Sequence, residues 1–188
     1  MFNSIQKMRE IKKQSKIQDN VSYDDESRVI VPISVENDDG FLSPYSIKGE
    51  EIISQDVADF LEDNIAGSPI KNGLHLQIQG KTIDKVEEKR YENGIRNYYR
   101  KKVLDINRDL KRNAIASLIM FLTGCLILTL YLVIEFSNSH HILAGIIDIA
   151  AWVFVWEAVD LFLIQRKLLK LKAIRYYELF NSKMSFVS

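Results

Sequence analysis

The sequence predicts an α-helical membrane protein: a two-helix transmembrane hairpin with long cytosolic helical extensions and a small α+β N-terminal domain. The first observation is a pair of apolar runs at residues 114–136 and 141–164, and the first run has no charged residue from Ala114 to Ile134. A helix needs about 20 apolar residues to cross the hydrocarbon layer, so each run predicts one transmembrane helix. Residues 137–140 between them are polar and suffice only for a short external turn.

The second observation is the distribution of basic residues. Lysine and arginine are frequent before the first run and after the second, and residues 137–140 contain neither. This asymmetry is typical of the positive-inside rule, so it predicts a multi-pass protein of the cell membrane with both termini in the cytoplasm. Each basic residue near an anionic membrane surface contributes about 1 kcal/mol of attraction. The residues expected to contact lipid headgroups are Arg100, Lys101, Lys102, Lys111, Arg112, Arg166, Lys167 and Lys170.

Tyrosines alternate with basic residues ahead of the first run, a pattern that also occurs in nucleic-acid-binding proteins. Topology alone accounts for these charges, so we expect no nucleic-acid partner. The whole chain has 25 basic and 25 acidic residues and a formal net charge of zero, an average over unlike segments that indicates no partner.

Residues 1–20 form a basic N-terminal segment. Phe2, Ile5, Met8 and Ile11 recur at a spacing of three, which drifts around a helix and leaves only a weak apolar stripe. Two interpretations stay open: a basic helix on the anionic inner leaflet, or a solvated terminus. The segment lacks the apolar core of a signal peptide, so we expect the N-terminal part to remain on the side of synthesis.

Residues 21–82 predict the small α+β cytosolic domain. The β-branched stretch 27–35 predicts a strand, and Pro32 within it favours an edge position because proline has no N–H for a sheet ladder. Residues 74–79 alternate between apolar and polar, which predicts a half-buried strand with His75 on the polar face.

A helix is expected between these strands, over residues 55–65, with Ser54 as its N-cap. The order strand, helix, strand suits a parallel βαβ crossover. The expected apolar face of the helix consists of Val57, Phe60, Leu61 and Ile65.

Residues 83–113 predict a basic juxtamembrane helix that begins at a capping pair, Asp84 with Glu87. No proline interrupts the chain from there to Phe136, so a single helix is expected to run from the cytosolic domain through the first apolar run. Gly94 is the one plausible hinge in it, at a cost of about 1 kcal/mol relative to alanine.

Residues 165–188 predict a basic cytosolic C-terminal helix and tail. The second membrane helix is expected to continue to Phe180, and residues 181–188 are expected to be loose.

Small residues recur along both apolar runs. Ala144, Ala151 and Ala158 lie seven residues apart in the second, and Ser117 and Gly124 lie seven apart in the first. Small side chains let two membrane helices approach closely. We interpret these residues as the facing seams of the helix pair, with the alternative that one seam serves a neighbouring subunit.

The second run also contains three acidic residues, Asp148, Glu157 and Asp160. A charge in the bilayer core costs roughly 2.5–3.5 kcal/mol on insertion scales, so each acid needs a partner. Asp148 is expected to be protonated or hydrogen-bonded to a hydroxyl of the first helix, and Asp160 to extend toward Arg166 or Lys167. Glu157 suggests a polar contact with another subunit, another protein or a water-filled path. The candidate hydroxyl partners of Asp148 are Ser117, Thr123 and Thr129.

Motifs for chemistry are lacking in the sequence. Residues 36–40 are acidic but do not have the ligand spacing of a calcium loop. No glycine-rich phosphate loop follows the first strand, and His75 has no second histidine, aspartate or glutamate at a supporting spacing. The single cysteine, Cys125, permits no intramolecular disulfide. We therefore expect no metal, cofactor, small-molecule substrate or enzymatic activity.

Three functions compete, and they differ in how well these observations support them. In the first, the hairpin anchors a small cytosolic interaction or regulatory module, as part of an oligomer or a complex with another membrane protein. In the second, several hairpins form an ion- or proton-conducting pore, a membrane effector gated by the cytosolic domain and lined by Glu157 or Asp148. A membrane-bound enzyme is the weakest of the three, because no nucleophile–base pair is apparent.

Overall fold

The computed structural model describes residues 22–35, 40–47, 49–66, 72–80, 83–136 and 141–187. The basic segment 1–20 and the turn 137–140 lie outside these residues. The described chain is mostly helical. It divides into two compact units, one formed by Met1–Asn97 with Glu178–Ser188 and the other by Tyr98–Tyr177.

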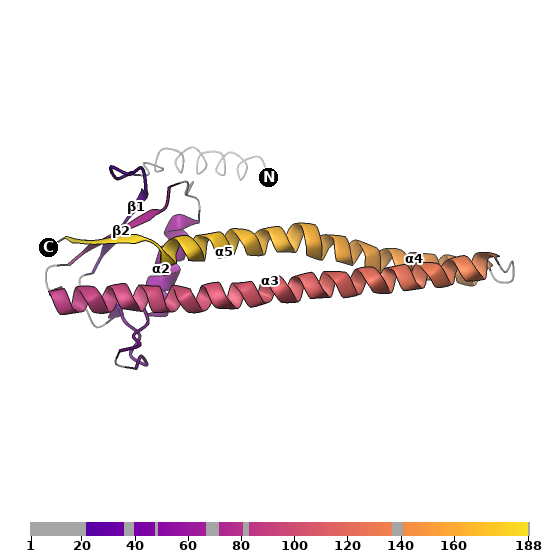
Figure 1. The fold of residues 1–188 in the computed structure, drawn as a ribbon, viewed down its shortest axis with the longest axis horizontal. Coiled ribbons are helices and arrows are strands. Elements are labelled where there is room, and N and C mark those ends of the chain that lie inside the picture. The colour runs from indigo at the N-terminus through magenta and orange to yellow at the C-terminus, as the bar shows by residue number, and fades with distance from the viewer. Residues whose placement is uncertain are drawn as a thin grey trace, which may run out of the picture. The chain divides into compact units, whose positions relative to one another are not determined.

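The first unit contains a three-stranded sheet whose strands are β1 (Val29–Ser34), β2 (Leu74–Gln79) and β3 (Lys183–Val187). Their order is β1-β2-β3 and both pairings are parallel. Figure 1 shows the three strands side by side, with the yellow C-terminal strand next to β2. Pro32 lies on β1, which is an edge strand of this sheet. Its missing N–H therefore breaks no hydrogen bond to a neighbouring strand on the outer side of β1.

The C-terminal residues correct one expectation. Residues 181–188 were expected to be loose, but β3 pairs with β2 from His75↔Lys183 to Gln79↔Val187. The short stretch has no turn or pattern signal of its own, and its partner strand lies more than a hundred residues earlier in the chain. The sheet therefore belongs to both ends of the sequence, and the domain boundary at residue 82 excludes one of its strands.

The core of this unit lies on one face of the sheet. The inward residues of β1 and β2 are at most 5% exposed; they are Val29, Val31, Ile33, Leu74, Leu76 and Ile78. Helix α2 (Gln55–Ile65) begins at the predicted cap, where the Ser54 hydroxyl accepts the Val57 N–H. Its buried face is Ala58, Leu61 and Ile65, a stripe at spacings of three and four.

Phe60 departs from the expected apolar face of α2. The side chain is 45% exposed. Residue 60 lies about 100° around the helix from Leu61, so once Ala58, Leu61 and Ile65 face the core the ring points toward solvent.

Helix α3 (Lys85–Phe136) begins at the predicted capping pair. The Glu87 N–H donates to Asp84 Oδ1 at 2.7 Å, and the Asp84 N–H donates to Glu87 Oε2 at 3.0 Å. The helix continues through Gly94 without a break. A Cβ on Gly94 would lie 2.7 Å from Leu42 Cδ2, so this glycine makes room for the loop before α2.

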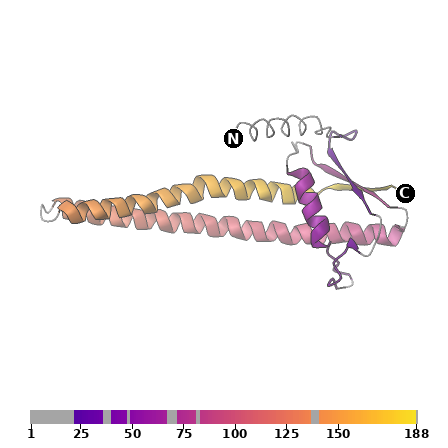
Figure 2. The ribbon, with the colours of Figure 1, turned by 180° about the vertical axis from the view of Figure 1, so that it is seen from behind.

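The second unit is a helical pair. One partner is α3 from Tyr98 onward; the other runs through α4 (His141–Val159), the π-helix η2 (Asp160–Gln165) and α5 (Arg166–Phe180). Figures 1 and 2 show the two partners alongside each other in opposite views. Among the described residues, α3 is the one helix long and apolar enough to cross a membrane, and only 11% of its most apolar stretch is buried.

Candidate functional site

The predicted small residues that the structure describes lie buried in the contact between α3 and α4. Ser117, Ala151 and Ala158 are 6%, 0% and 3% exposed. A Cβ on Gly124 would lie 2.7 Å from Val155 Cγ2, so a side chain there would have to displace Val155. Ala144 lies in α4, where its side chain is outside the described part. Four of the five seam residues thus line one helix–helix contact.

Two side chains of α3 donate hydrogen bonds across this contact. The Ser117 hydroxyl donates to the Ala158 carbonyl at 2.9 Å, and the Asn113 amide donates to the Leu161 carbonyl at 2.7 Å. Asn113 and Ser117 are four residues apart and therefore share one face of α3. Asn113 was not among the predicted site residues, although a polar residue one turn before Ser117 at the start of an apolar run was a usable signal.

These bonds overturn the expected pairing of Asp148 with Ser117. Ser117 lies opposite Ala158, and Asp148 is ten residues away, roughly 15 Å along the helix axis. Thr129 is also engaged elsewhere, because its hydroxyl donates to the Cys125 carbonyl of its own helix at 2.8 Å. Threonine in a helix commonly bonds to the carbonyl four residues earlier.

The three acidic residues of the second run do not form one cluster. Asp148 and Asp160 are half-buried, and Glu157 is exposed. Gln165 donates to the Asp160 carboxylate at 2.9 Å, whereas Arg166, one of its expected partners, lies over the Phe162 ring at 5.2 Å. In the described part of the chain, no group of three or more His, Cys, Asp or Glu side chains is placed to hold a metal ion.

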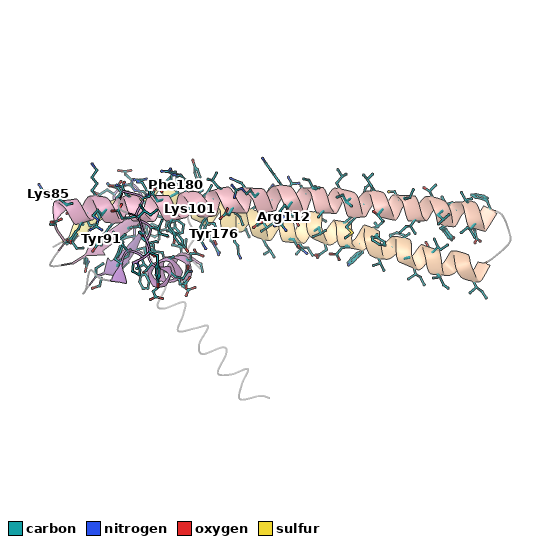
Figure 3. The ribbon with its side chains drawn as sticks, turned by 90° about the horizontal axis from the view of Figure 1, so that it is seen from below. Lys85, Tyr91, Lys101, Arg112, Tyr176 and Phe180 are labelled. Atoms are coloured by element: carbon teal, nitrogen blue, oxygen red, sulfur yellow. The ribbon has the colours of Figure 1, made fainter. Side chains whose placement is uncertain are left out.

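The predicted headgroup residues fall into several environments. Lys102 lies over the rings of Tyr98 and Tyr176, at 5.2 and 5.8 Å, so its ammonium group bridges α3 and α5. Arg112 is 3.8 Å from Asp109 of its own helix. Figure 3 shows side chains projecting outward along both helices of the pair. The exposed members of the predicted set are Arg100, Lys101, Lys111, Arg112, Lys167 and Lys170, and Arg166 is half-buried.

A chain of hydrogen bonds crosses the polar face of the sheet. His75 Nδ1 lies 3.0 Å from Asp24 Oδ2, and its Nε2 lies 2.9 Å from Ser185 Oγ. Asp24 and Ser185 are 51 and 110 residues from His75. No local spacing signals such a contact, so the sequence predicts His75 only as a polar-face residue. We refer to these residues as the Asp24–His75–Ser185 chain.

Asp24 is held in the ionised form. Burial raises the pKa of this carboxyl, but hydrogen bonds from the Arg28 N–H, the Arg28 guanidinium and the Glu26 N–H outweigh burial and hold the pKa well below its usual range. An ionised Asp24 favours the His75 tautomer with a proton on Nδ1, which leaves Nε2 to accept the Ser185 hydroxyl proton.

This arrangement corrects the expectation that the chain has no nucleophile–base pair. Serine, histidine and carboxylate in this order of contact have the geometry of a proton-transfer chain. Arg28 also forms an ion pair with Asp24 at 2.8 Å, so the carboxylate charge that would stabilise a protonated imidazole is already partly neutralised. The direct effect of the Asp24–His75–Ser185 chain is structural, because its hydrogen bonds join the segment before β1 to strands β2 and β3.

Glu51 connects the loop before α2 to the first part of α3. Its carboxylate accepts the Gly49 N–H at 3.1 Å and Arg90 Nε at 3.4 Å, and its carbonyl accepts the Asn97 amide. The side chain is nearly buried. Hydrogen bonds from its own N–H and that of Gly49, supported by Arg90, lower the pKa of this carboxyl despite burial.

No protein-family model, curated protein or solved structure matches the chain.

Proposed function

We propose that the protein is an integral membrane protein of two spans, with both termini in the cytoplasm, whose hairpin anchors a small cytosolic interaction or regulatory module as part of an oligomer or complex. One observation carries the proposal: β2 immediately precedes α3, β3 immediately follows α5, and β2 and β3 are neighbours in one sheet. The hairpin is then an insertion in a crossover connection between two parallel strands.

Apolar exposure on the helical pair supports its insertion in a membrane. Large apolar residues of α3 and α4 are widely exposed, including Leu126 at 72%, Trp152 at 61% and Trp156 at 73%. A soluble monomer rarely exposes a contiguous apolar surface of this kind, because each Å² costs about 25 cal/mol in water. Lipid acyl chains would cover it at no such cost.

The pairing of β2 with β3, which joins the two ends of the hairpin, supports a regulatory role for the module. Arg96 Nη1 donates to the Phe180 carbonyl at 2.9 Å, so the first part of α3 and the end of α5 are bonded directly. A partner or ligand that shifts β2 against β3 would act on both helices of the hairpin. A simple tether needs only one connection to its membrane helix, whereas this module has two.

Glu157 supports association with a second subunit or another membrane protein. The residue is exposed on α4 between Trp156 and Ala158, where an ionised carboxylate in lipid costs roughly 2.5–3.5 kcal/mol. A polar partner from another chain would remove that cost. The same residue supports the second candidate function, a pore of several hairpins in which Glu157 faces water.

Topology is tested by cysteine labelling in a Cys125→Ser background. We expect an impermeant maleimide added to intact cells to label Asn138→Cys, in the proposed external turn, and to label Tyr45→Cys only after lysis. Tyr45 is 92% exposed in the first unit, so accessibility does not limit its labelling. Labelling of residue 45 in intact cells, or carbonate extraction of the protein from membranes, would exclude the proposed topology.

Oligomeric mass in nanodiscs separates the two candidate functions. For the anchoring function we expect a dimer or small complex, weakened by Glu157→Gln and unchanged by Glu50→Gln, an exposed glutamate of the first unit. A ring of four or more subunits with ion flux through liposomes, abolished by Glu157→Gln while the ring persists, would favour the pore instead.

A further inference from the structure

Two adjoining hollows lie on the helical pair where η2 joins α4. The first has a volume of about 530 Å³ and is almost entirely apolar. It is lined by Ala114, Ser117, Leu118, Phe121, Ala158, Val159, Phe162 and Leu163. The second has a volume of about 300 Å³ and is lined by Phe162, Leu163, Arg166, Lys167 and Lys170. Phe162 and Leu163 line both, so an apolar groove opens beside a basic patch.

The walls of the groove are held by specific contacts. Ser117 and Asn113 bond to the carbonyls of Ala158 and Leu161, which fixes α3 against the opposite wall. The Leu161 carbonyl also accepts the Arg166 N–H across the π-turn. π-Helical turns are rare and are often found at functional sites. The groove is thus part of a defined helix–helix contact.

The charge beside the groove is positive. Arg166, Lys167 and Lys170 contribute three cations, and the nearest acid of η2, Asp160, accepts a hydrogen bond from Gln165. Arg166 lies over the Phe162 ring, so a residue that lines both hollows also positions one of the cations. The complementary ligand has an apolar chain and an anionic head joined to it.

We propose that this site binds one anionic phospholipid per chain, with an acyl chain in the apolar groove and the phosphate at Arg166, Lys167 and Lys170. The groove volume falls within the roughly 300–1,000 Å³ of ordinary ligand sites. The proposal rests on the proposed membrane function, since it places these cations at the level of the inner headgroups. It goes beyond general attraction to a charged surface, because it requires a groove and one bound molecule.

The test is native mass spectrometry of the full-length protein, purified in detergent and titrated with dioleoyl phosphatidylglycerol or dioleoyl phosphatidylcholine. We expect one phosphatidylglycerol retained per chain and much weaker retention of phosphatidylcholine. Arg166→Gln with Lys170→Gln should weaken phosphatidylglycerol binding roughly 30-fold, which corresponds to about 1 kcal/mol for each basic residue. The matched control, Lys85→Gln with Lys89→Gln, removes the same charge from exposed positions that lie outside both hollows and outside the expected headgroup set, and it should leave binding unchanged.

A second pair of variants tests the groove itself. Leu118 lines it and Leu122 does not, and both are 57% exposed on α3. Leu118→Trp should fill the groove and abolish selective retention, whereas Leu122→Trp should not. Equal retention of both lipids, equal loss in the test and control charge variants, or no effect of Leu118→Trp would each overturn the proposal. A protein absent from the membrane fraction would instead refute the proposed function.

Discussion

Gly124 lies where α3 packs tightly against α4, and a single methyl group there tests the helix contact. A Cβ at this position would lie 2.7 Å from Val155 Cγ2, 3.2 Å from Val155 N and 3.4 Å from the Ala151 carbonyl oxygen. Rotation of Val155 could relieve the first contact at some cost, because β-branched side chains have one strongly preferred rotamer in a helix. The distance to the Ala151 carbonyl oxygen is an ordinary contact, but the 3.2 Å contact to Val155 N is tight and is relieved only if the helices move slightly apart.

We therefore expect Gly124→Ala to destabilise the helical pair. Overpacking a close contact costs about 1–3 kcal/mol, whereas alanine gains up to about 1 kcal/mol over glycine in helix propensity. With the full propensity gain, the net loss should be up to roughly 2 kcal/mol, and Gly124→Leu should lose more. Separation of the helices would also weaken the bonds that Ser117 and Asn113 make to the opposite helix.

The matched control is Gly145→Ala in α4, where an added Cβ meets nothing within 4 Å. This variant should be neutral or slightly stabilising, because only the propensity term remains. The assay is SDS-induced unfolding of the full-length protein from bicelles, followed by circular dichroism. If Gly124→Ala were as stable as Gly145→Ala, the assignment of Gly124 to the seam would be refuted.

Three further predictions follow from contacts in the two units. Ser117→Ala, which removes the bond to the Ala158 carbonyl, should cost roughly 0.6–1.7 kcal/mol in the same unfolding assay. Ser185→Ala should lower the melting temperature, because His75 loses its bond to β3. In the native protein, Ser185 should not react with a fluorophosphonate probe. Labelling of Ser185 by this probe would contradict a purely structural role. Glu51 has a lowered pKa in the folded state, so its stabilising effect is present above its unfolded pKa of about 4.3 and is lost as the pH falls through the folded pKa. Urea titrations from pH 7 to pH 3 should therefore show a smaller loss of stability on acidification for Glu51→Gln than for the native protein.

The sheet joins the two ends of the helical pair, so hydrogen exchange in the sheet should change when the helical pair is disturbed. Since β2 and β3 are hydrogen-bonded neighbours, a change that separates α3 from α5 in the proposed hairpin should loosen β3. Hydrogen exchange at Ser185 and Phe186 would show this loosening in Gly124→Leu and not in Gly145→Ala. Unchanged protection of β3 in both variants would indicate that the two units respond independently.

Local patterns were sufficient to predict the elements whose signals lie within a few residues. Alternation located β2, Pro32 placed β1 at an edge, and Ser54 marked the start of α2. The capping pair at Asp84 and the absence of proline predicted one continuous helix to residue 136. Each of these features depends on backbone geometry or on hydrogen bonds between near neighbours, so the sequence alone contains the information.

Tertiary structure decided the features that join distant segments. Residues 183–187 become a strand only because β2 offers them an open edge, and His75 acquires partners only when Asp24 and Ser185 are brought to it. Ser117 was recognised as a small seam residue, but its acceptor, the Ala158 carbonyl, depends on the relative axial position of two helices. Spacing along one helix does not determine that axial position; side-chain packing between the two helices does.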